Sequence, residues 1–109
     1  VQLEAIQYTE FRLMAALSKG DSPGPESSVI KALSAEITQR ITELTVEAMG
    51  QYAAVHQPEA RTVGSNVATV GPDEGVVAFS RYFNLRASSI AGGSNEVQRN
   101  IMAKLVLGL

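Results

Sequence analysis

The feature that most limits the fold is a long helical pattern between Pro25 and Gly50. Its apolar residues recur at intervals of three or four, the spacing that places side chains on one face of an α-helix. They are Ile30, Leu33, Ile37, Ile41, Leu44 and Ala48. Proline suits the first helical turn and glycine suits a helix end. The pattern predicts a helix over Glu26–Met49 whose charged and polar residues form mostly a solvated face; these are Lys31, Glu36, Gln39, Arg40, Glu43 and Glu47.

Three other segments have weaker helical patterns. Residues 1–18 place five apolar side chains on one face: Leu3, Ile6, Leu13, Met14 and Leu17. Residues 76–90 follow Pro72, Asp73 and Glu74, and acids favour a first helical turn. Residues 95–107 follow a capping serine, Ser94, and stop at Gly108. We therefore predict an all-α, up-and-down bundle of about four helices.

The second and third predicted helices are separated by a long segment, residues 51–75, that has no sustained period. A loop of this length in a small domain is either an ordered functional loop or a mobile one. A short extended segment within residues 61–70 is a further expectation. His56 is interpreted as a surface or capping histidine.

Glu10 falls inside the apolar stripe of residues 1–18. Because an unpaired buried charge is costly, we expect it to pair with a cation on a neighbouring helix. A functional acid is the alternative.

Composition excludes several classes of protein. A net charge of −2 over 109 residues argues against a protein that coats nucleic acid, which needs a basic face. Without cysteine, disulfides and thiolate metal sites are excluded, and one histidine cannot form a His-rich metal site. No apolar run approaches the ~20 residues that span a bilayer. The start at Val1 suggests a piece of a longer chain, and the lack of a signal peptide favours the cytoplasm.

The segment with the most chemical information is Gly92-Gly93-Ser94. Two glycines allow another molecule to approach the backbone, and Ser94 opens a helix whose first N–H groups suit a phosphate or carboxylate. A plain tight turn between helices explains the same residues. On these residues alone, an anion-binding helical protein is a further possibility.

The stretch around these residues, Ile90-Ala-Gly-Gly-Ser-Asn-Glu-Val-Gln-Arg-Asn-Ile-Met-Ala-Lys, resembles the C-terminal signature of the acyl-CoA dehydrogenase family. The segments that begin at Val1, Glu26 and Ser80 resemble the preceding helices of that family. The resemblance covers residues 1–109 and implies the C-terminal helical domain, with the N-terminal helical and middle β domains absent from this sequence.

The resemblance implies a flavoenzyme that uses FAD to dehydrogenate the Cα–Cβ bond of an acyl-CoA thioester and passes electrons to an electron-transfer flavoprotein. It also implies a homo-oligomer, either a dimer or a tetramer. Ser94, Asn95 and Glu96 match cofactor-contacting positions, and Gly93 matches the glycine that lies against the thioester. A carboxylate would repel pyrophosphate, so Glu96 is expected to act through its backbone N–H.

Two departures from the family pattern concern catalysis and the cofactor. The usual catalytic base precedes Gly93, and this position is Gly92, which cannot accept a proton; no catalytic residue is therefore assigned. The base would lie on an earlier helix or on another subunit. The stretch Ala48-Met-Gly-Gln-Tyr52 also lacks the family's Gln-x-x-Gly-Gly segment. A non-catalytic, free-standing helical module that self-associates is the alternative function.

Overall fold

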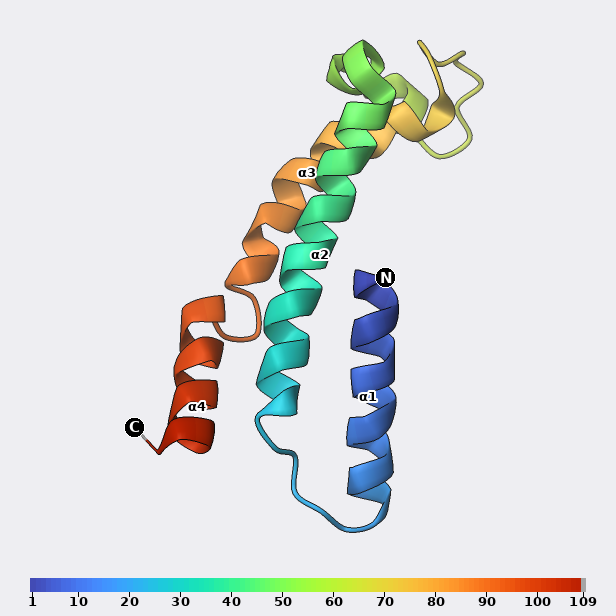
Figure 1. Cartoon of the computed structure of the whole chain (residues 1–109). Helices are drawn as coiled ribbons and strands as arrows, with labels where there is room; N and C mark the ends of the chain where they lie inside the picture. The colour runs from blue at the N-terminus through green and yellow to red at the C-terminus, as the bar shows by residue number, and fades with distance from the viewer. Residues whose placement is uncertain (109) are drawn as a thin grey trace. The chain divides into compact units, whose positions relative to one another are not determined.

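The computed structural model describes residues 1–108, in which every regular element is a helix and no strand occurs (Figure 1). The α-helices are α1 (Gln2–Ser18), α2 (Glu26–Met49), α3 (Ala78–Leu85) and α4 (Asn95–Leu107). Short 3-10 helices are η1 (Gly50–Ala54), η2 (Glu59–Arg61), η3 (Asp73–Val77) and η4 (Arg86–Ser89). The predicted all-α fold is confirmed, and α2 and α4 have the predicted bounds.

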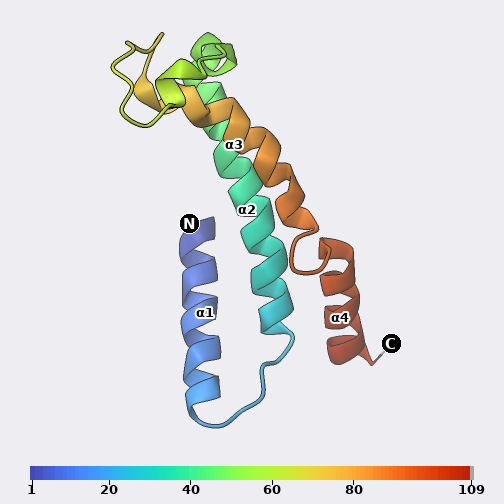
Figure 2. The same cartoon turned by 180° about the vertical axis from the view of Figure 1, so that it is seen from behind.

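The chain divides into two compact units, and α2 contributes residues to both. The first unit contains Val1–Thr38 and Ala87–Leu109, and the second contains Gln39–Arg86. In the first unit α1 runs antiparallel to the beginning of α2 (Figure 2). Side-chain bonds join α4 to the same part of α2.

The second unit contains the predicted loop, which includes η2 and parts of η1 and η3 and is otherwise irregular. The extended segment expected within residues 61–70 is not a strand. The side chain of Gln57 satisfies both backbone groups of Val70: Oε1 accepts from the N–H at 2.7 Å, and Nε2 donates to the carbonyl at 3.3 Å. An amide side chain therefore takes the place that a neighbouring strand would fill.

The third predicted helix, residues 76–90, is shorter than expected. Only Ala78–Leu85 is α-helical, and the tighter turns of η3 and η4 flank it. Such 3-10 turns are common at helix ends. At the N-terminal side, Gly75 is buried, and a Cβ there would lie 3.7 Å from both Met49 Sδ and Tyr52 O. Close packing of η3 on η1 thus accompanies the change of helix type.

The buried side of α2 is lined by small residues rather than by its apolar stripe. The buried residues are Ser28, Ala32, Ala35 and Thr42. At 3.6 residues per turn these positions lie on the opposite face from the stripe. Leu33, Ile41 and Leu44 of the stripe are 42%, 50% and 46% exposed. Small side chains let neighbouring backbones approach closely, so this face packs while the larger residues remain partly in solvent.

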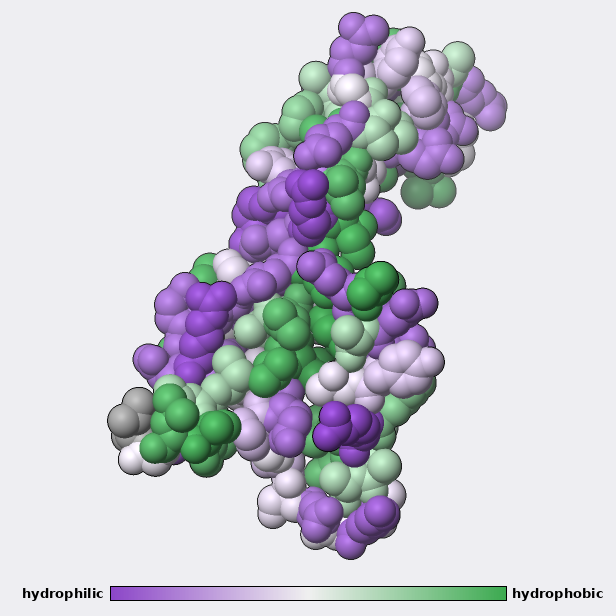
Figure 3. Space-filling model, in the orientation of Figure 1, coloured by the Kyte–Doolittle hydropathy of each residue, from purple (hydrophilic) through white to green (hydrophobic). Residues whose placement is uncertain are grey.

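Helix α1 has no buried residue, although its stripe was predicted to face a core. Ile6 and Leu13 are half-buried, whereas Leu3 and Met14 are more than half exposed. Glu10 is exposed and forms no ion pair with any residue in the range 1–108, so its predicted pairing is wrong. Figure 3 shows apolar side chains reaching the surface between polar ones.

Candidate functional site

The glycine corner, defined here as residues 90–94, links η4 to α4. Gly92 and Gly93 have φ angles of +67° and +93°, which L-residues rarely adopt. A Cβ at Gly92 would meet no heavy atom within 4 Å, whereas one at Gly93 would lie 2.8 Å from Gln98 Nε2. The backbone is therefore open at Gly92, while the flexible amide of Gln98 covers Gly93.

Ser94 caps α4 as predicted. Its hydroxyl oxygen accepts from the Val97 N–H at 3.3 Å, and its carbonyl accepts from the Gln98 N–H at 3.0 Å. The Ser94 hydroxyl thus supplies an acceptor for one of the N–H groups that a helix start leaves without an intrahelical partner, and the Ser94 carbonyl accepts the first regular bond of the helix. The cap fixes where α4 begins relative to the two glycines.

The carboxylate of Glu96 turns back toward this helix start. Its own backbone N–H and then the Ser94 hydroxyl donate hydrogen bonds that lower the pKa of Glu96 below its ordinary 4.5. The positive end of the α4 dipole also favours a negative charge here. The exposed carboxylate of Glu96 therefore adds a negative charge at the start of α4.

Asn95, which was predicted to contact the cofactor, has its side chain inside the protein. It is only 6% exposed, and its Oδ1 accepts from Lys31 Nζ at 2.9 Å. The Asn95 side chain is consequently engaged within the protein rather than presented to a ligand. Sequence analysis placed Lys31 on the solvated face, and the missed signal is that Lys31 lies three residues after Ser28 and four before Ala35, on the face that is buried.

No residue of the corner is suited to accept a proton from a substrate. Gly92 and Gly93 lack side chains, and Glu96, the one carboxylate in residues 90–98, is turned to its own N–H and to Ser94. The first cation along α4, Arg99, pairs with Glu36 at 2.7 Å. The corner can hold groups against backbone N–H donors, but it supplies no general base.

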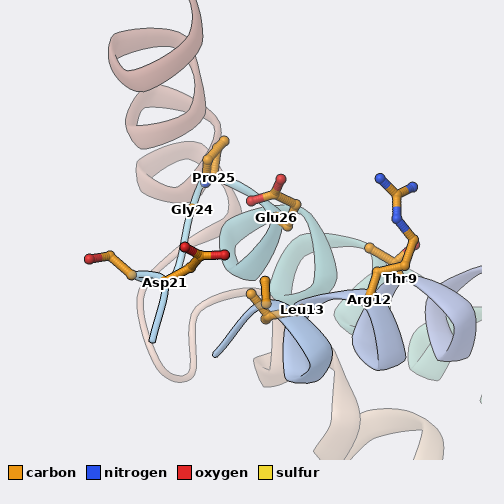
Figure 4. A pocket seen from close by; sticks show the side chains of 9 residues that line it. Thr9, Arg12, Leu13, Asp21, Gly24, Pro25 and Glu26 are labelled. Atoms are coloured by element: carbon orange, nitrogen blue, oxygen red, sulfur yellow. The ribbon is translucent and has the colours of Figure 1, made fainter. Parts of the chain in front are cut away.

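Two hollows lie elsewhere in the chain. One of about 350 Å³ lies between α1 and the linker to α2; in Figure 4, Arg12 projects from α1 while Asp21 and Glu26 come from the linker and the start of α2. Its mixed charges favour no single class of ligand. A smaller hollow of about 100 Å³ is lined by the exposed His56, together with Arg61 and Ser80.

The arrangement defines a class of protein. It is an all-α domain in which two glycines with positive φ precede the last helix, and a serine caps the start of that helix. The family model described as "Acyl-CoA dehydrogenase, C-terminal domain" matches residues 1–107, and the chain belongs to this family. The family consists generally of FAD-dependent oxidoreductases. Searches of curated proteins and of solved structures found no match.

Two further findings concern membranes and metals. None of the helices within residues 1–108 is both long and apolar enough to cross a membrane. Over the same residues, no group of three or more His, Asp or Glu side chains could hold a metal ion.

Proposed function

We propose that the chain is the FAD-contacting and oligomerisation domain of an acyl-CoA dehydrogenase. The observation that carries this proposal is the glycine corner followed by the Ser94 cap, within a chain that matches the family's C-terminal domain over residues 1–107. A bound FAD would supply the hydride acceptor for α,β-dehydrogenation of an acyl-CoA thioester, with an electron-transfer flavoprotein as the final electron acceptor.

The residues of the corner fit cofactor contact through the backbone. Glycine has no Cβ, so the backbone at Gly92 is open to an approaching ligand, and at Gly93 only the flexible amide of Gln98 lies in the way. The start of α4 offers N–H donors and a favourable dipole to a phosphate. In this proposal Ser94 and Glu96 contact FAD, Glu96 through its N–H, and Gly93 lies against the thioester. Asn95 contributes its backbone alone, because its side chain bonds to Lys31.

The Glu96 carboxylate weakens this contact. It already occupies the helix start, so a phosphate has to displace it or approach against its charge. The corner also contacts a ligand from one side only. We therefore expect weak FAD binding by this chain, and we assign α-proton abstraction to a carboxylate outside the corner, in another part of the protein or on another subunit.

Titration of the chain with FAD, followed by equilibrium dialysis and flavin fluorescence, tests the contact. Ser94→Ala should weaken binding because it removes the cap. Glu96→Gln should strengthen binding because it removes the competing charge. Glu74→Gln, at an exposed glutamate of η3, is the matched control and should have no effect. Sub-micromolar binding that ignores the Ser94 and Glu96 substitutions would contradict the proposal, as would no binding at millimolar FAD.

Exposed apolar residues support the oligomerisation part of the proposal. On α1 the largest are Leu3, Tyr8, Phe11 and Met14, which are 57–68% exposed. Extended apolar surface of this kind usually marks an interface. The same observation, together with Gly92 at the base position, favours the second candidate function, a non-catalytic module that self-associates.

Light scattering after size-exclusion chromatography tests the assembly. We expect a dimer or larger species, and Met14→Glu or Leu33→Glu should shift it toward monomer. Gln7→Glu, at an exposed polar position of α1, introduces the same charge without removing an apolar side chain and should leave the mass unchanged. A monomer at high concentration would contradict self-association through the exposed apolar residues, which both candidate functions require. FAD binding separates the two candidates, because only the first requires it.

A further inference from the structure

Lys31 bridges the two ends of the glycine corner. Its Nζ donates to Asn95 Oδ1 at 2.9 Å and to the carbonyl oxygen of Ser89 at 3.3 Å. Ser89 ends η4 and Asn95 begins α4, so the residues between the two acceptors are those of the corner. One ammonium group on α2 thus ties both sides of the corner to the same point.

The position of this charge is unusual for a helix start. The N-terminus of a helix carries positive partial charge, which disfavours a nearby cation. Lys31 is compensated by two oxygen acceptors, one of them on a side chain that is only 6% exposed. A bond to a buried amide restricts the geometry more than a surface ion pair does, because the amide cannot turn to solvent instead.

We propose that Lys31 is a positioning residue for the glycine corner: by holding Ser89 and Asn95 to α2, it fixes the path of Gly92 and Gly93 and the direction in which α4 begins. Its importance for cofactor contact rests on the proposed function. The positioning itself concerns the chain alone and can be measured without flavin.

A second link between α2 and α4 provides a matched comparison. Arg99 Nη2 lies 2.7 Å from Glu36 Oε1, and these side chains are 60% and 46% exposed. This pair joins the same two helices but touches no residue of the corner. Removing the Arg99–Glu36 pair therefore shows the effect of weakening the α2–α4 contact alone. Removing Lys31 weakens the same contact and also releases the corner.

The experiment compares Lys31→Met with Arg99→Met in the full chain, with Lys104→Met as a control for loss of an exposed lysine on α4. Amide hydrogen exchange is measured by NMR at Ile90, Ala91, Val97 and Gln98, whose N–H groups are hydrogen-bonded on either side of Gly92 and Gly93, and circular dichroism checks helix content. We expect Lys31→Met to speed exchange at these amides by about tenfold or more, the effect of losing a charged hydrogen bond. Arg99→Met and Lys104→Met should change the exchange rate of these amides by less than about threefold, as expected for exposed charges.

Rescue separates positioning from simple packing. Lys31→Arg retains a cation with several donors and should restore most of the slow exchange, whereas Lys31→Gln should not. Equal acceleration by Lys31→Met and Arg99→Met, or no acceleration by Lys31→Met, would overturn the proposal. If Lys31→Met unfolds the chain, Asn95→Leu takes its place. Faster exchange at the same four amides in Asn95→Leu than in Arg99→Met then supports the proposal, and an equal rate overturns it.

FAD titration of the same variants separates this inference from the proposed function. If Lys31→Met accelerates exchange and weakens FAD binding in parallel, the positioning role of Lys31 and the proposed cofactor contact are both supported. If exchange is accelerated but the unchanged chain binds no FAD, Lys31 still positions the corner and the proposed cofactor contact is wrong. If FAD binds and exchange is unaffected, the cofactor contact stands and Lys31 does not position the corner.

Discussion

The guanidinium group of Arg86 lies against the carboxylate of Glu43, with Nη1 2.9 Å from Oε1. Its Nη2 donates to Gln39 O at 2.8 Å and to Thr42 Oγ1 at 3.0 Å, and its carbon Cζ lies 4.5 Å from the centre of the Tyr82 ring. In the other direction, Gln39 Nε2 donates to Arg86 O at 2.9 Å. Arg86 therefore joins the end of α3 to α2 within the second unit.

Replacement of Arg86 by alanine should lower the free energy of unfolding by about 1–3 kcal/mol, mainly through lost hydrogen bonds to Gln39 O and the buried Thr42. The Glu43 pair itself is partly exposed and should contribute less than these hydrogen bonds. Arg86→Lys should recover only part of the loss because lysine lacks the forked donors. Urea unfolding measures the change. Arg81→Ala, at an exposed position of α3, should be close to neutral; equal losses for both variants would contradict this account.

Acidification should weaken the second unit through Glu43. Hydrogen bonds from Arg40 and then from Arg86 lower the pKa of Glu43 below its ordinary 4.5. A carboxyl group with a lowered pKa stabilises the folded state fully above its unfolded value, and that contribution disappears as the pH falls through the folded value. The urea midpoint should therefore fall below pH 4.5 more in the unchanged chain than in Glu43→Gln. Parallel pH profiles would exclude Glu43 as a source of acid sensitivity.

Gly71 and Gly64 allow backbone strain to be separated from steric overlap. Both have positive φ, +83° and +81°, so alanine at either position should cost about 1–2 kcal/mol. A Cβ at Gly71 would also overlap the side chain of Tyr52, lying 2.9 Å from its Cβ, whereas one at Gly64 meets nothing within 4 Å. Gly71→Ala should thus be clearly more destabilising than Gly64→Ala in thermal unfolding. Equal effects would mean that Tyr52 moves away freely.

The Ser94 cap should be detectable without any ligand. Ser94→Ala removes the acceptor for the Val97 N–H and should destabilise α4 by about 1 kcal/mol. The same substitution removes a donor to Glu96, so the pKa of Glu96 should rise toward its ordinary value. NMR titration of Glu96 in the unchanged chain and in Ser94→Ala measures this shift. An unchanged Glu96 titration would show that the Ser94 hydroxyl does not reach the carboxylate.

The bounds of the best-formed helices were predictable because local signals determine them. Pro25 and Gly50 flank α2, and Ser94 and Gly108 flank α4, so turn and capping chemistry marks each end. Residues 76–90 are also flanked by such signals, Pro72 before them and Gly92 after them, but the change between α and 3-10 geometry within them was not predictable from periodicity. The stretch 61–70 looked extended because its composition is loop-like, but Gln57, remote in sequence, decides its pairing.

Which faces are buried was much less predictable. The apolar stripe of α2 is the stronger sequence pattern, yet the close contacts are made by Ser28, Ala32, Ala35 and Thr42. Hydrophobic periodicity identifies a helix without specifying which of its faces meets a given neighbour. For the same reason the site residues were only partly assigned: the Ser94 cap follows from local sequence, whereas the bond from Lys31 to Asn95 depends on tertiary contact.

The bonds that hold the glycine corner also have a consequence for the order of folding. Lys31 and Asn95 are 64 residues apart in sequence, and Glu36 and Arg99 are 63 apart. Closing a loop of that length costs entropy that must be lost before the contact is gained, and such non-local contacts slow folding. Helix α2 has start and stop signals next to it in sequence, Pro25 and Gly50, whereas the contacts of α4 with α2 are all of this distant kind. The contacts that hold the corner to α2 are therefore expected to form late in folding, after α2 itself.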